Sequence, residues 1–173
     1  ITGEEHKLEY VSPLHINGNI RGAIIVGFET EEEFTDRKIR LIEAATRGLA
    51  AWRSKSAFER ADALHAIADE MIRRKDEGAR MISTETGKPM VQSEREWVLS
   101  CDQFRWYAEE ARRIYGRIVE SRVPGGRFEV LRQPVGITAA FTAWNFPAAL
   151  VARKAAPALA AGCPIIIRPS SQT

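Results

Sequence analysis

Cysteine and histidine are scarce in this sequence of 173 residues. The two cysteines, Cys101 and Cys163, form no CxxC pair, which argues against a disulfide framework and favours a reducing cytoplasm. The three histidines, His6, His15 and His65, are dispersed and have no cysteine beside them. We therefore expect no metal site, because structural and catalytic metal sites need clustered ligands.

Charge of one sign and long apolar runs are also missing. The 25 basic and 23 acidic residues leave a net charge of only +2 and are scattered along the chain. This pattern predicts neither a nucleic-acid surface nor a membrane patch. No apolar run approaches the ~20 residues that span a bilayer, and no signal peptide opens the chain. The remaining composition, 45% hydrophobic and 28% charged, is that of a soluble globular domain.

The first part of the chain predicts a β-hairpin followed by a helix. Residues 7–29 hold two strand-like runs around Asn17-Gly18, a pair suited to a tight turn. Thr35 or Asp36 could cap the next helix, whose apolar face is Ile39, Ile42, Ala45, Leu49 and Trp52. The boundary between the two predicted parts, a hairpin segment at 1–35 and a domain at 36–173, falls near residues 30–36.

Two more long helices are predicted. One runs over residues 56–82 and is broken by the turn at 86–89, which contains Gly87 and Pro89. The other runs from about Val91 to Tyr115, and Gly116 is expected to end it.

The pattern then changes to that of an α/β crossover. Residues 128–130 alternate as in a half-exposed strand, whereas the apolar run 136–141 predicts a fully covered parallel strand. An alanine-rich helix at 148–161, ended by Gly162, leads to a second buried strand at 165–167. Strand, helix and strand in this order predict a parallel, Rossmann-like sheet.

Ligands of open α/β sheets bind beyond the carboxyl ends of the strands. Asn145 follows the first of these strands, and its amide could stabilise an oxyanion. It could instead cap the next helix, and its position alone favours this cap interpretation. Arg168, at the end of the second strand, could contact a ribose or a phosphate, or it could be a solvated surface arginine.

Several motifs are similar to those of the aldehyde dehydrogenase superfamily. The resemblance covers about residues 49–173. The matching segments are Ala50-Ala51-Trp52-Arg53, Glu85-Thr86-Gly87-Lys88-Pro89, Arg132-Gln133-Pro134-Val135-Gly136, Trp144-Asn145-Phe146-Pro147, and Arg153-Lys154 with Pro157-Ala158-Leu159-Ala160-Ala161-Gly162-Cys163. The resemblance implies the first part of a coenzyme-binding domain that uses NAD or NADP to oxidise a small aldehyde, in a protein that forms homo-oligomers.

The resemblance also implies roles for single residues. Asn145 matches the family's oxyanion-hole asparagine, which makes the cap interpretation second to it. Phe141, Thr142 and Trp144 match positions that line the coenzyme cleft. Arg168 stands where the family usually has a lysine that holds the adenosine ribose, and arginine is planar and bulkier.

Coenzyme and substrate preference depend on two further positions. Ser171 stands where NAD-preferring members often have a glutamate that binds the ribose 2′-hydroxyl. Because a serine there removes the repulsion against a 2′-phosphate, NADP is also a candidate coenzyme. The segments at 106–110 and 113–116 are similar to succinate-semialdehyde dehydrogenases, in which the arginine matching Arg153 binds the substrate carboxylate. An ordinary helix-surface arginine is an equal alternative for Arg153.

Some of the family's features are absent from these residues. Its Gly-rich turn, its general-base glutamate and its nucleophilic cysteine would lie beyond Thr173, so the segment alone is expected to be inactive. Cys163 matches a buried packing cysteine rather than the nucleophile, and Cys101 lies mid-helix among apolar residues and is also expected in the core. Ala143 replaces the family's usual proline.

Residues 10–49 also resemble the C-terminal half of a GAF domain. They could instead be a divergent form of the dehydrogenase's opening strands and first helix. Two other functions therefore stay open beside the dehydrogenase: a non-catalytic module for oligomerisation or weak nucleotide binding, and a GAF-like sensory domain.

Overall fold

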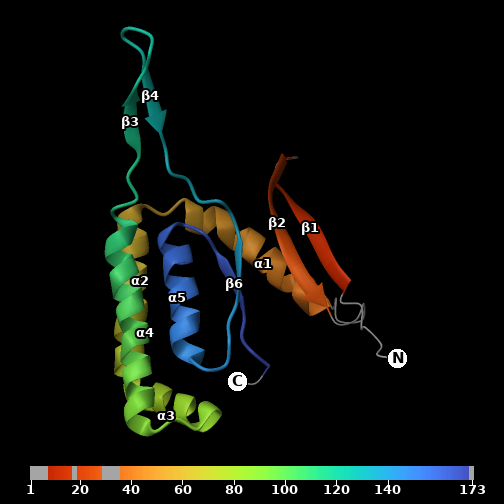
Figure 1. Cartoon of the computed structure of the whole chain (residues 1–173), viewed down its shortest axis with the longest axis vertical. Coiled ribbons are helices and arrows are strands. Elements are labelled where there is room, and N and C mark those ends of the chain that lie inside the picture. The colour runs from red at the N-terminus through yellow and green to blue at the C-terminus, as the bar shows by residue number, and fades with distance from the viewer. Residues whose placement is uncertain (1–7, 17–18, 29–35, 172–173) are drawn as a thin grey trace.

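The computed structural model describes residues 8–16, 19–28 and 36–171 of an α/β chain. A β-hairpin comes first, then four helices, a second hairpin and a strand–helix–strand unit (Figure 1). The elements are β1 (Leu8–Ile16), β2 (Asn19–Phe28), α1 (Asp36–Arg53), α2 (Ala57–Arg73), α3 (Lys75–Thr86), α4 (Met90–Ala111), β3 (Arg117–Glu120), β4 (Arg127–Val130), β5 (Thr138–Phe141), α5 (Pro147–Ala160) and β6 (Ile165–Arg168).

The predicted N-terminal hairpin is confirmed. β1 and β2 pair antiparallel, from Leu8 opposite Phe28 to Ile16 opposite Asn19. The predicted turn at residues 17–18 and the possible cap Thr35 lie outside the described residues.

Three helices, α2, α4 and α5, lie side by side and form the core (Figure 1). Small side chains let the helices approach closely, and one phenylalanine and one leucine fill the remaining space. The fully or nearly fully buried members of this core are Ala61, Leu64, Ala68, Phe104, Ala108, Ala111, Ala152, Ala155, Ala156 and Ala160. This packing fixes α5, and with it the loop that precedes α5, against α4.

The prediction of one helix over residues 56–82 is wrong. The backbone leaves the helical conformation at Arg74 (φ −98°, ψ 24°), and α3 then runs across the lower ends of α2 and α4 (Figure 1). The cause is tertiary packing: Gly78 of α3 lies directly under the indole of Trp97 on α4. The Trp97 ring nitrogen donates a hydrogen bond of 2.7 Å to the carbonyl oxygen of Met71, which holds the ring in the bend.

Gly116 does not end α4, contrary to the prediction. That helix ends at Ala111, and Gly116 instead allows a close backbone approach, since a Cβ there would lie 2.4 Å from the Val130 carbonyl oxygen. The strand β3, which the sequence analysis missed, follows and pairs antiparallel with β4. Gly125, with φ +79°, lies in the connecting turn.

The predicted crossover is confirmed. β5 and β6 pair in parallel, with Thr138 opposite Ile165, and α5 connects them. Gly162, with φ +84°, follows α5 as expected. Within the described residues the two strands are less covered than predicted: Ala140 alone is buried in β5, and the isoleucines of β6 are half-buried.

Both cysteines are buried and unpaired, as the sequence indicated. Burial raises the pKa of the Cys101 thiol above its ordinary value. Among the described residues, no helix is long and apolar enough to cross a bilayer.

Candidate functional site

The carboxyl ends of β5 and β6 bring three of the predicted coenzyme residues together. Phe141 and Arg168 are register partners in the two strands. The backbone N–H of Thr142 donates to the Arg168 carbonyl oxygen at 3.2 Å, which extends the pairing by one residue. This is the edge of the sheet at which ligands of α/β proteins bind.

The loop between β5 and α5 carries Trp144 and Asn145 on this edge. Both side chains are exposed, Trp144 to 51%. The cap interpretation of Asn145 is wrong: the N-cap residue of α5 is Phe146, and no side chain at that position bonds to the first turn. Within the described part of the chain, the Asn145 amide makes no hydrogen bond. The amide is therefore available to a ligand.

The first turn of α5 is held by a residue of another helix. Glu96 of α4 is only 4% exposed, and its Oε1 accepts hydrogen bonds from the N–H groups of Ala148 (3.0 Å) and Ala149 (3.3 Å). A carboxylate at this end of a helix also interacts favourably with the helix dipole. The other carboxylate oxygen, Oε2, forms an ion pair with Lys88.

Glu96 is not among the site residues predicted from sequence. One local signal existed: Ser93, Glu96 and Ser100 continue, at helical spacing, the face that carries Cys101 and Phe104. The structure shows that all three are buried, which is unusual for polar residues. Lys88 is part of the motif at residues 85–89, but its sequence context predicted no role for it.

The turn between α3 and α4 holds Lys88 in place. Gly87 adopts φ +72°, and the Ser83 hydroxyl donates to the Lys88 carbonyl oxygen at 2.7 Å. The Lys88 ammonium lies 3.9 Å from the centre of the Phe146 ring, a cation–π distance. Lys88 thus contacts both Glu96 and the residue after Asn145.

Arg153 and Ser171 lie outside this cluster. Arg153 is exposed on α5, about 9 Å along the helix axis from Pro147, and forms no ion pair with another described residue. Ser171 is exposed and follows the end of β6 at Arg168 by three residues.

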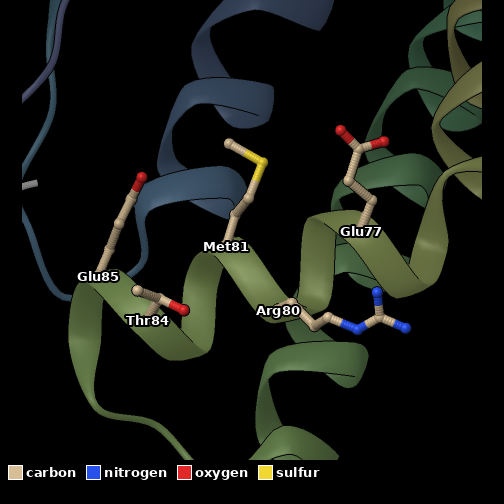
Figure 2. Close-up of a pocket in the computed structure, with 5 residues that line it drawn as sticks. All are labelled: Glu77, Arg80, Met81, Thr84 and Glu85. Carbon is tan, nitrogen blue, oxygen red and sulfur yellow. The ribbon is translucent and has the colours of Figure 1, made fainter.

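A recess of about 310 Å³ lies elsewhere, along α3. All its lining side chains come from this one helix, and Figure 2 shows them spread along its surface rather than around an enclosed space. Four are polar or charged and one is apolar: Glu77, Arg80, Met81, Thr84 and Glu85. None of them is a predicted site residue, and Glu77 already pairs with Arg74.

Curated proteins and solved structures show what this chain resembles. It is 47% identical over 134 residues to a glutarate-semialdehyde dehydrogenase of Pseudomonas putida, an alignment that covers 78% of this chain and 28% of the relative. It is 45% identical over 132 residues to an NADP(+) succinate-semialdehyde dehydrogenase of Escherichia coli, with 76% and 27% covered. The crystal structure of an E. coli NADP-dependent enzyme superposes with a TM-score of 0.78 at 43% identity and covers 80% of this chain and 29% of that one.

The chain therefore spans a little more than a quarter of the length of the relatives it matches. The family model described as "Aldehyde dehydrogenase family" matches residues 29–173. That range includes residues 29–49, which the GAF-like interpretation also claimed, and leaves residues 1–28 outside the match. The GAF resemblance stays a prediction. The chain belongs to the aldehyde dehydrogenase family.

Proposed function

We propose that this chain supplies the strand edge and the oxyanion donor of an NAD(P)-dependent dehydrogenase for aldehydes that carry a carboxylate. The observation that carries the proposal is the Asn145 loop, whose amide is exposed and unbonded at the carboxyl edge of β5 and β6. The relatives at 45–47% identity are named for succinate and glutarate semialdehyde, both of which are aldehydes with a carboxylate.

The strand edge fits a nicotinamide coenzyme, which would accept a hydride when bound. Phe141 and Trp144 present exposed aromatic surface, and Thr142 adjoins them. Arg168 contributes a cation suited to a ribose or phosphate group. Ser171 places no carboxylate near a ribose 2′-phosphate, so we propose that NADP is accepted as well as NAD.

Asn145 would act on the aldehyde oxygen. When a thiolate adds to the aldehyde, the carbonyl oxygen gains negative charge. A side-chain N–H aimed at that oxygen stabilises it, and one such donor is typically worth about 2.7–4 kcal/mol in the transition state. The family's cysteine and general-base glutamate would have to come from residues outside 1–173.

Arg153 would bind the substrate carboxylate. Its guanidinium is exposed and has no ion-pair partner among the described residues. Lys154 beside it is exposed as well, which provides a matched control.

The test compares substrates in a complete dehydrogenase that contains this segment. Arg153→Gln should raise KM for succinate semialdehyde about 10–100-fold, the worth of a charged hydrogen bond, and leave KM for uncharged butanal unchanged. Lys154→Gln should change neither value. If Arg153→Gln affects both aldehydes equally, the proposed substrate contact is wrong.

We also propose that the complete protein forms homo-oligomers through the β3–β4 hairpin. This hairpin projects away from the helices (Figure 1) and exposes apolar side chains, namely Ile118, Val119, Val123 and Phe128. A second copy of the chain would cover them. Replacement of Ile118 and Phe128 by serine should lower the oligomeric mass measured by light scattering. A purely sensory or non-catalytic role is not favoured, because the matched relatives are named as dehydrogenases.

A further inference from the structure

The loop that carries Asn145 is anchored on both sides and not in its middle. On the strand side, the Thr142 N–H bonds to the Arg168 carbonyl oxygen at 3.2 Å. On the helix side, Glu96 accepts from Ala148 and Ala149. Asn145 itself makes no hydrogen bond within the described residues. The two anchors therefore fix the position of the loop backbone from which its amide projects.

The helix-side anchor is a buried charged group that is fully satisfied. The Glu96 side chain is 2% exposed and that of Lys88 17%. A carboxylate buried alone would be costly, but here one oxygen receives two N–H groups at a helix N-terminus and the other receives the Lys88 ammonium. Such a carboxylate has one favourable position, so it fixes where α5 begins.

Lys88 adds a contact on the residue next to Asn145. Its ammonium lies 3.9 Å from the centre of the Phe146 ring, and its backbone is held in the α3–α4 turn by Ser83. Lys88 therefore connects a rigid turn to the last loop residue before α5. These contacts give a physical reason for the Gly87-Lys88 pair in the turn at residues 86–89. The carboxyl edge of β5 and β6, where the coenzyme would bind, does not explain this pair.

From these contacts we infer that Lys88 and Glu96 are positioning residues that aim the Asn145 amide at the reacting oxygen. The inference rests on the proposed function, because the catalytic step requires the oxyanion role of Asn145. Both residues act through the start of α5 and touch neither substrate nor coenzyme. A displacement of a reacting group by about 1 Å can cost about 10²-fold in rate, so a small shift of this helix start has a measurable effect.

The first experiment measures amide hydrogen exchange by NMR in this chain. Glu96→Asp keeps the charge but withdraws the carboxylate by one methylene, and we expect protection of the Ala148 and Ala149 amides to fall at least tenfold. The amides of α2 should keep their protection. Glu96→Gln keeps an acceptor oxygen for the two amides but turns an NH2 group toward the Lys88 ammonium, so it should restore only part of the protection. Glu94→Gln, on the same helix but in an exposed pair with Lys75, is the control and should change nothing at α5.

A double variant covers the case in which Glu96→Asp does not fold. Lys88→Met with Glu96→Gln removes both buried charges together, which proteins tolerate better than the loss of one. It should keep the Ala148 and Ala149 amides protected and shift the side-chain NH₂ signals of Asn145, because the cation over Phe146 is gone. If these signals do not move, the role of Lys88 is overturned.

The second experiment measures kinetics in a complete dehydrogenase that contains this segment. Glu96→Asp should lower kcat about 10²-fold with little change in KM for the coenzyme, and Glu96→Gln, which keeps the acceptor oxygen but not the partner of Lys88, should restore only part of kcat. Loss of amide protection equally throughout the chain, or none at α5, would overturn the inference. Loss confined to α5 with normal kcat would also overturn the positioning role. A normal kcat in Asn145→Ala would instead refute the oxyanion role of Asn145 itself.

Discussion

The contact between Gly78 and Trp97 predicts opposite effects for the same substitution at two helical glycines. Gly78 lies in α3 and Gly48 in α1, both within the helix. A Cβ added at Gly78 would lie 2.3–2.4 Å from three atoms of the Trp97 indole, whereas a Cβ at Gly48 would meet nothing within 4 Å. We expect Gly48→Ala to stabilise the fold and Gly78→Ala to destabilise it.

The magnitudes follow from two opposing effects. Replacing a mid-helix glycine by alanine lowers the entropy lost on folding and is worth about 0.5–1 kcal/mol. Overpacking a well-packed site costs about 1–3 kcal/mol, and the upper part of this range applies because the hydrogen bond to Met71 holds the indole in place. The free energy of unfolding should therefore rise by about 0.5–1 kcal/mol for Gly48→Ala and fall by about 1–2 kcal/mol for Gly78→Ala.

Urea unfolding followed by circular dichroism measures both changes. A double variant, Gly78→Ala with Trp97→Phe, tests the cause: the smaller ring should recover part of the loss, so the two substitutions should not be additive. If Gly78→Ala stabilises the protein as Gly48→Ala does, α3 does not pack on Trp97 as described. The explanation of the bend at Arg74 would then fail with it.

Three further predictions use the same chain. Gly162→Ala should lower the free energy of unfolding by about 2–3 kcal/mol, because φ is +84° and a Cβ would lie 2.8 Å from the Pro134 ring. Gly87→Ala should lower it by only about 1 kcal/mol, because φ is +72° but a Cβ would meet nothing within 4 Å. A larger loss at Gly87 than at Gly162 would contradict this. Ser171→Glu should weaken NADP binding relative to NAD in calorimetry, through repulsion of the 2′-phosphate, and an unchanged ratio would count against the position of Ser171. The 173-residue chain alone should not oxidise succinate semialdehyde with either coenzyme, and turnover abolished by replacing Cys101 or Cys163 would refute that.

The crossover could be predicted from sequence because its signals are local. The apolar run before Phe141, the alanine-rich helix and Gly162 each indicate one element without reference to the rest of the chain. The bend at Arg74 has no such signal, since good helix formers continue through it and the cause lies at Trp97, on another helix. Gly116 was misinterpreted for a related reason: its close neighbour is the backbone of Val130, 14 residues later.

The same distinction separates the two parts of the site. Asn145 and Arg168 could be placed on one edge because Asn145 follows β5, Arg168 ends β6, and these two strands pair in parallel. The contact of Glu96 with Ala148 spans 52 residues and exists only because α4 and α5 pack together. A sequence pattern can suggest a buried carboxylate, but only the packing of helices shows which backbone groups it binds.

The Asn145 amide gives the prediction that separates catalysis from stability. Asn145 is exposed, is not the N-cap of α5, and bonds to no described residue. Asn145→Ala should therefore leave the melting temperature of this chain unchanged, whereas loss of a true helix cap costs about 1 kcal/mol. In a complete dehydrogenase that contains the segment, the same change should lower kcat by about 10²–10³-fold, because a donor to the developing oxyanion is lost.

The coenzyme contacts provide the internal control for Asn145→Ala. Phe141 and Arg168 end the two strands, Thr142 directly follows β5, and none of them depends on the Asn145 side chain. KM for NAD or NADP should therefore stay within about twofold of its original value. Differential loss of this kind, in kcat and not in coenzyme KM, marks an interaction made mainly in the transition state. If kcat stays normal while the melting temperature falls, Asn145 supports the helix rather than the reaction. The oxyanion donor would then have to be sought among other groups on this edge.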